Sequence, residues 1–174
     1  YMYDCVKDKK SLVFSNSREE TEYLCATFRQ IARARGDQDV FLIHHGNLSA
    51  SYRETAEAVM KDEEQCMTTV TTATLELGID IGSLTACVLC GYPGTIASTW
   101  QQAGRAGRRG NVSLTIFVAS SAPLDQYIIN HPDYFFEQSS EQALINPDNL
   151  YILINHVKCA AYELPFEEGE KYAG

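Results

Sequence analysis

Residues 84–110 read LTACVLCGYPGTIASTWQQAGRAGRRG, and this stretch places a short apolar run directly before a helix. The run from Leu84 to Gly91 has the length and composition of a buried strand, and Pro93-Gly94 is typical of a turn. Thr95 or a neighbouring hydroxyl can cap the helix that follows, and Gly110 supplies a stop at its other end. We therefore expect a strand, a tight turn and one helix that ends at Gly110.

The C-terminal part of this helix carries the pattern Gln101-x-x-Gly104-Arg105-x-Gly107-Arg108. Residues three apart share a helical face, so Arg105 and Arg108 are predicted to lie together beside two positions without side chains. Guanidinium groups keep their charge and suit the transition state of phosphoryl transfer, where an arginine finger raises the rate by roughly 10³ to 10⁵. The alternative is a basic helix end that faces water and complements the helix dipole.

Short apolar runs alternate with amphipathic segments along much of the chain. After a polar lead (1–10), strands are expected at 11–14, 40–44, 66–70, 84–91 and 112–119, and helices at 18–36, about 50–61, 123–130 and 151–164. This alternation predicts an α/β fold whose parallel sheet is covered by helices on both faces. Ligands of such sheets bind beyond the C-terminal strand ends, which points to four loops at 15–18, 45–53, 71–82 and 93–109.

Composition narrows the class of protein. The chain has 174 residues and a net charge of −9, from 14 basic and 23 acidic residues. The acidic balance argues against coating nucleic acid by overall charge, although a few placed cations are enough for phosphate contact. No apolar run is long enough to cross a membrane, and no signal-peptide pattern opens the sequence. We expect a cytoplasmic piece of a larger protein, without membrane contact.

Two further patterns resemble metal sites. Cys87-x-x-Cys90 lies in a predicted strand, where positions three apart point to opposite faces, so we expect buried free thiols and no metal. The acidic run at 62–65 ends a helix before a strand, whereas an acid that holds magnesium should follow a strand. No G-x-x-x-x-G-K-[ST] phosphate loop occurs. The sequence therefore offers arginines for a nucleotide but no cradle, which must lie on another domain or subunit.

Four groups of residues, in chain order, resemble motifs of superfamily 2 helicases of the DEAD/DEAH-box type, and the match to their second motor domain covers roughly 11–119. The segment 14–18 resembles motif IV, and His45-Gly46 with Arg53 resembles the "HG…R" element. Thr72 to Asp80 resembles motif V, and 101–108 resembles motif VI. The segment LELGIDIG at 75–82 is similar to the corresponding segment of large helicase-related proteins and of bacterial repair helicases with a cysteine-rich C-terminal domain.

This resemblance implies a RecA-like sheet without its own phosphate loop at 1–122 and a helical extension towards accessory domains at 123–174. It implies ATP and Mg²⁺ held mainly by an N-terminal RecA-like domain, and a nucleic-acid strand, with DNA slightly favoured because Gln101 stands where many RNA-unwinding members carry His. Catalytic roles fall on Gln101, Arg105 and Arg108, nucleotide contacts on Gly78, Asp80, Gly104 and Gly107, and nucleic-acid contacts on Asn16, Ser17, Arg18, Gly46, Arg53 and Thr72.

Several alternatives remain open from the sequence. The motor could translocate without separating strands, or the domain could be a degenerate, non-catalytic binding module. Arg18 and Arg53 could be surface cations, and Thr72 and Asp80 could serve local turn geometry. Trp100 is expected to be a buried helix anchor rather than a platform for a base. His44 is expected to be a satisfied core residue, and His45 to orient its loop.

Overall fold

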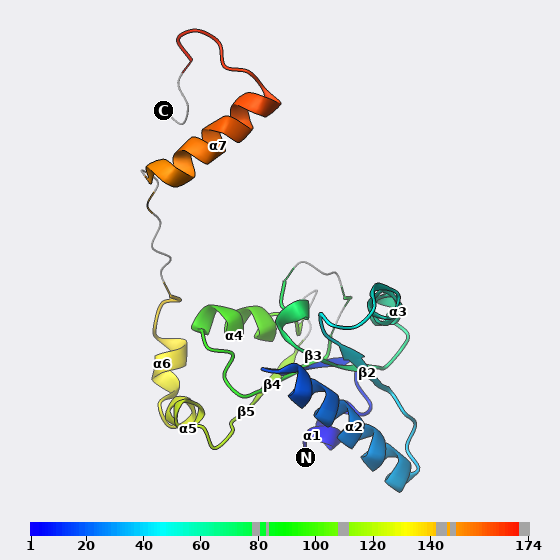
Figure 1. The fold of residues 1–174 in the computed structure, drawn as a ribbon. Coiled ribbons are helices and arrows are strands. Elements are labelled where there is room, and N and C mark those ends of the chain that lie inside the picture. The colour runs from blue at the N-terminus through cyan, green and yellow to red at the C-terminus, as the bar shows by residue number, and fades with distance from the viewer. Residues whose placement is uncertain (78–80, 83, 108–111, 142–145, 147–148, 171–174) are drawn as a thin grey trace. The chain divides into compact units, whose positions relative to one another are not determined.

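The computed structural model describes residues 1–77, 81–82, 84–107, 112–141, 146 and 149–170 (Figure 1). By the contacts between residues, the chain divides into two units, Tyr1–Glu141 and Gln142–Gly174. The first unit carries the sheet, and the second carries one helix, α7 (Leu150–Glu163). The functional boundary expected between residues 122 and 123 stays a prediction.

Five strands form one sheet in the order β2-β3-β1-β4-β5, and every neighbouring pair is parallel. The predicted parallel sheet is therefore confirmed, because the expected apolar runs supply its strands. The strands are β1 (Ser11–Ser15), β2 (Phe41–His44), β3 (Thr68–Thr71), β4 (Ala86–Cys90) and β5 (Leu114–Val118).

Three helices of the first unit begin at a hydroxyl side chain that caps them, at Ser17, Ser49 and Thr95. Ser17 accepts a hydrogen bond from the Glu20 amide, and the Glu20 carboxylate accepts one from the Asn16 amide, which gives a close variant of a capping box. The helix that follows ends at Gly36, in the left-handed conformation at φ 73°. The helices are α1 (Met2–Val6), α2 (Arg18–Arg35), α3 (Ala50–Lys61), the 3₁₀ turn η1 (Ala73–Leu75), α4 (Ile96–Ala103), α5 (Pro123–Asn130) and α6 (Pro132–Phe136).

Helix α4 is shorter than the sequence predicts. Thr95 caps it as expected, but it ends at Ala103, and the Gly104 amide donates to the Trp100 carbonyl. Glycines at 104 and 107 weaken a helix, and Gly107 takes a φ of 86° while its amide donates to the Leu84 carbonyl. The expectation that Arg105 lies inside a helix that runs to Gly110 is therefore wrong. The segment 1–10, predicted to be a polar lead, contains the helix α1, in which Tyr3 and Val6 are buried.

Alternating strand residues fill two apolar clusters, one on each face of the sheet. Helices α1 and α2 cover one face, and α3, η1 and the segment after α4 cover the other (Figure 1). Cys90 belongs to the first cluster and Cys87 to the second, so the two thiols point to opposite faces, as predicted. Burial raises the pKa of both thiols to about 12, which keeps them protonated and unreactive near neutral pH.

Two carboxylates tie the last part of the first unit to other segments: Asp125 of α5 binds the segments after β4 and β5, and Glu141, which follows α6, binds the start of α4. Asp125 is buried and accepts hydrogen bonds from the amides of Tyr92 and Ser120, at 3.0 and 2.7 Å. Burial raises the pKa of Asp125, but the hydrogen bonds from Ser120 and Tyr92 outweigh it, and the pKa is lowered overall. Glu141 accepts from the first amides of α4, which lowers the pKa of Glu141.

None of the described helices combines the length and apolarity of a membrane span.

Candidate functional site

The loops predicted to act together do follow one edge of the sheet. All five strands are parallel, so the C-terminal ends of β1, β2, β3 and β4 meet at the same edge. Asn16 follows β1, and its side-chain amide donates to the carbonyl of Tyr92, which follows β4, at 3.0 Å. Gly91 takes a φ of 80°, and a Cβ on it would lie only 3.0 Å from the side-chain amide nitrogen of Asn16. This contact gives Asn16 a structural task at the edge where a ligand contact is predicted.

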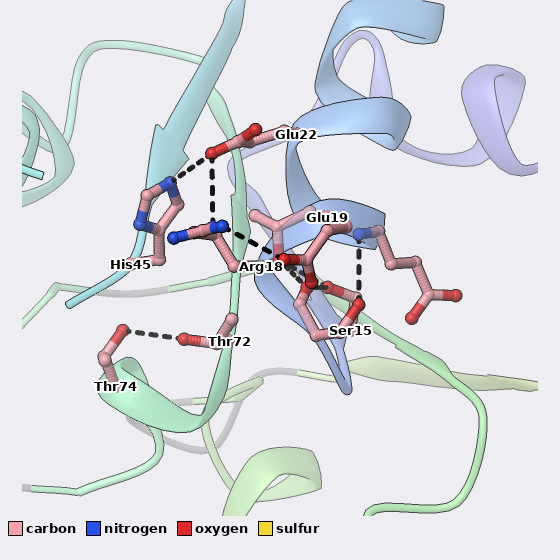
Figure 2. Close-up of polar contacts among 10 residues, drawn as sticks. Ser15, Arg18, Glu19, Glu22, His45, Thr72 and Thr74 are labelled. Carbon is pink, nitrogen blue, oxygen red and sulfur yellow. Dashed lines mark hydrogen bonds and ion pairs between the residues drawn. The ribbon is translucent and has the colours of Figure 1, made fainter. Parts of the chain in front are cut away.

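Arg18 lies at the start of α2 within a cluster of charged side chains (Figure 2). Its guanidinium is 3.1 Å from Glu19 and 3.8 Å from Glu22, and the side chain is 47% exposed. The Glu22 carboxylate is also 3.3 Å from Nε2 of His45, a buried residue that directly follows β2. Glu22 therefore joins the segment after β1 to the segment after β2. A phosphate bound by Arg18 would have to compete with these carboxylates.

Thr72 follows β3 and directly precedes the turn η1, and Figure 2 shows it beside Thr74. Their hydroxyl oxygens are 3.5 Å apart, and the Thr74 hydroxyl is 3.0 Å from Nδ1 of His44. Nε2 of His44 lies 3.0 Å from the carboxylate of Glu57 in α3. His44 is thus a buried residue with both ring nitrogens in contact, as predicted, and it holds η1 against β2 and α3.

Arg53 lies in the first turn of α3, half-buried near the same edge. Its Nε is buried, and it finds no hydrogen-bond acceptor in the described part of the chain. Such a group is costly unless a partner arrives, so it is suited to an anionic ligand. Gly46 is exposed in the turn before this helix, and a Cβ there would meet only Thr74 at 3.9 Å. The small residue is therefore not demanded by packing.

The residues resembling motifs V and VI meet in a small pocket. This pocket, of about 230 Å³, is lined by Glu76, Leu77, Ile81, Gly82, Trp100, Gln101, Gly104 and Arg105. Nε of Arg105 donates to the Glu76 carbonyl at 2.9 Å, and a terminal guanidinium nitrogen donates to the same oxygen. Gln101 is exposed at the rim, whereas its neighbour Gln102 points inward and donates to the Glu76 carboxylate at 3.0 Å. The pocket wall thus presents a guanidinium and an amide rather than a cluster of metal-binding acids.

Some predicted site residues are not placed. Gly78, Asp80 and Arg108 lie outside the described residues, and so does the expected pairing of Arg108 with Arg105. Gly107 is exposed, and its role in nucleotide contact stays a prediction. Ser17 is accounted for as the cap of α2.

The prediction for Trp100 is wrong, and three polar residues of the site were not predicted. Trp100 is 46% exposed and packs its ring against Phe135 and Phe136, because α6 supplies an aromatic surface that the spacing within α4 does not reveal. Glu22, Glu76 and Gln102 connect segments far apart in the chain. For Gln102 a signal existed, since it lies on the helix face of Ile96 and Thr99, which are both buried.

Comparison with known proteins identifies the family. The model of the helicase conserved C-terminal domain matches residues 1–110, which is more than half of the chain. The chain belongs to this helicase family. The ATP-dependent helicase YprA of Bacillus subtilis, described as uncharacterized, is 46% identical over 94% of the chain. The ATP-dependent helicase HRQ1 of Saccharomyces cerevisiae is 38% identical, again over 94% of the chain.

Solved structures show the same relationship for this helicase C-terminal domain. The DUF1998 helicase MrfA, bound to DNA and AMPPNP, is 43% identical and matches 99% of the chain with a TM-score of 0.86. The helicase Lhr of Mycobacterium smegmatis, bound to ssDNA and AMP-PNP, is 27% identical and matches 93% with a TM-score of 0.75. The chain spans only 22% of YprA, 16% of HRQ1 and 24% of the MrfA chain. The RecA-like fold expected from the sequence is confirmed by these neighbours.

Proposed function

We propose that this domain is the second motor domain of an ATP-dependent nucleic-acid helicase and works as part of a longer chain. Arg105 and Arg108 act as arginine fingers on ATP that a partner RecA-like domain binds, and Gln101 helps to orient the reacting phosphate. The observation that carries the proposal is the pocket in which Gln101, Gly104 and Arg105 face the motif V segment at the C-terminal sheet edge. Arginine fingers act by stabilising charge that appears in the transition state.

The donors in this pocket fit phosphate oxygens and do not fit Mg²⁺. The Glu76 carboxylate already accepts a hydrogen bond from Gln102, and Arg105 repels a cation. The described residues contain no group of three or more histidine, cysteine or acidic side chains that could hold a metal. Mg²⁺ would therefore be held by the partner domain, where it neutralises phosphate charge. Gly78, Asp80, Gly104 and Gly107 are proposed to contact the nucleotide from this side.

The nucleic-acid strand is proposed to cross the neighbouring part of the same edge. Asn16, Ser17, Arg18, Gly46, Arg53 and Thr72 contact its backbone there, with DNA favoured over RNA. The unpartnered Nε of Arg53 and the exposed backbone at Gly46 support this placement. Closing the cleft would bring the arginines to ATP and shift the grip on the strand, which couples hydrolysis to movement.

This function is tested on the full protein that contains the domain. ATP hydrolysis should rise when a single DNA strand is added, and a labelled strand should leave a partial duplex only while ATP is consumed. Strand-stimulated hydrolysis without displacement would favour a translocase. A protein that binds the strand but hydrolyses no ATP would contradict the proposal and favour a non-catalytic binding module.

Replacing Arg53 with alanine should weaken strand binding to a similar extent on unrelated sequences, because a phosphate contact carries no base information. The slope of log affinity against log salt should become shallower by about one unit. Fluorescence anisotropy over a salt series measures both quantities. Arg33→Ala is the matched control, since Arg33 is an exposed arginine in the last turn of α2, at the end of α2 that is far from Arg18. Equal salt slopes for Arg53→Ala and the control would remove Arg53 from the grip.

A further inference from the structure

Glu76 touches both halves of the candidate site. It directly follows the turn η1, which Thr72 directly precedes, and its amide donates to the Ala73 carbonyl at 2.9 Å. Its carbonyl accepts from Arg105, and its carboxylate accepts from Gln102. One short turn therefore has the proposed strand contact at one end and the proposed arginine finger at the other.

The pair formed by Glu76 and Gln102 is buried. Glu76 is 8% exposed and Gln102 is 4% exposed, and 3.0 Å separates the amide nitrogen from the carboxylate oxygen. Removal of either side chain would leave the other buried without this bond. Because an unsatisfied buried polar group is costly in free energy, the two side chains are held in this geometry. The side-chain bond thus fixes the Glu76 backbone against α4, and with it the carbonyl that receives Arg105.

We propose that Glu76 is a positioning residue, anchored by Gln102, that couples the placement of Arg105 to the turn carrying Thr72. This inference rests on the proposed function, because it assigns Arg105 to the nucleotide and Thr72 to the strand. A strand bound at Thr72 biases η1, and the rigid bond to α4 transmits that bias to the guanidinium. Loss of the bond should lower the stimulation of hydrolysis by the strand more than it lowers binding of the strand or of ATP.

The kinetic experiment uses the full protein and compares Glu76→Ala, Gln102→Ala and the exchange Glu76→Gln with Gln102→Glu. Each single variant should lower strand-stimulated kcat by about tenfold or more, because small misplacement of a catalytic group is costly. KM for ATP should stay within about twofold, as expected for an interaction made mainly in the transition state. The exchange keeps a donor facing an acceptor with the direction reversed, and it should restore kcat to within about threefold of wild type. Glu64→Ala, at an exposed position, is the control.

Hydrogen exchange separates this inference from the proposed function. In the same protein, Gln102→Ala should speed hydrogen exchange of the amides at 73–77. The double variant, Glu76→Gln with Gln102→Glu, should slow this hydrogen exchange again. Equal melting temperatures for the variants would exclude general unfolding. Unchanged exchange at 73–77 would overturn the linkage, whatever the hydrolysis rates. Faster exchange with no change in strand stimulation would overturn the coupling role. If Arg105→Ala left hydrolysis unchanged while the linkage held, the proposed function would fail instead.

Discussion

Arg105→Ala in the full protein is expected to lower strand-stimulated kcat for ATP hydrolysis by about 10³-fold, with little change in strand affinity. The guanidinium lies in the pocket wall, where its Nε and a terminal nitrogen donate to one carbonyl of the motif V segment. This arrangement fixes the plane of the group and directs it before a nucleotide arrives, which is how preorganised charge lowers a barrier. Steady-state hydrolysis at saturating strand measures the effect.

Two comparisons sharpen this result. Arg105→Lys keeps the charge but loses the planar fork, so it should recover only a small part of the rate. The control variant Arg33→Ala, which replaces an exposed arginine on α2, should hydrolyse ATP at the wild-type rate. The finger role is rejected if the Arg105→Ala rate stays within about threefold of wild type, since an arginine finger contributes far more than that.

Phe14→Ala is expected to destabilise the first unit by roughly 3–5 kcal/mol, the range for removal of a buried phenylalanine. Phe14 is 2% exposed in β1, the central strand, where it packs in the cluster with Leu12, Met60 and Leu89. Urea unfolding of the 174-residue chain, followed by circular dichroism, gives the free energy of unfolding. Tyr23→Ala is the control, because Tyr23 is 71% exposed on α2. A loss of less than about 1 kcal/mol would show that β1 does not carry the core as described.

Most of the fold follows from local patterns in the sequence. Apolar runs of strand length predicted all five strands, and the hydroxyl expected to cap the helix after Pro93-Gly94 is that of Thr95. The end of α4 could not be predicted as easily. Gly104 and Gly107 weaken a helix, but the Gly107 amide also bonds to the Leu84 carbonyl, which turns the chain back to the sheet. This tertiary contact cannot be seen in the local sequence pattern.

The candidate site was predictable where residue order alone defines it. Parallel strands bring their C-terminal ends to one edge, so Asn16, Gly46 and Thr72 had to lie along that edge. The bond from Gln102 to Glu76 spans 26 residues and joins two side chains whose types are ordinary on any helix or turn. Such a pair becomes visible only once the turn η1 and α4 are placed against each other.

The most direct measurement is a structure of the full protein with a non-hydrolysable ATP analogue and a DNA strand bound. The guanidinium of Arg105 should then lie within hydrogen-bond distance of the γ-phosphate, with the strand backbone next to Arg53 and Thr72. A closed complex in which Arg105 keeps its bonds to the Glu76 carbonyl and contacts no phosphate would contradict the proposed arginine finger.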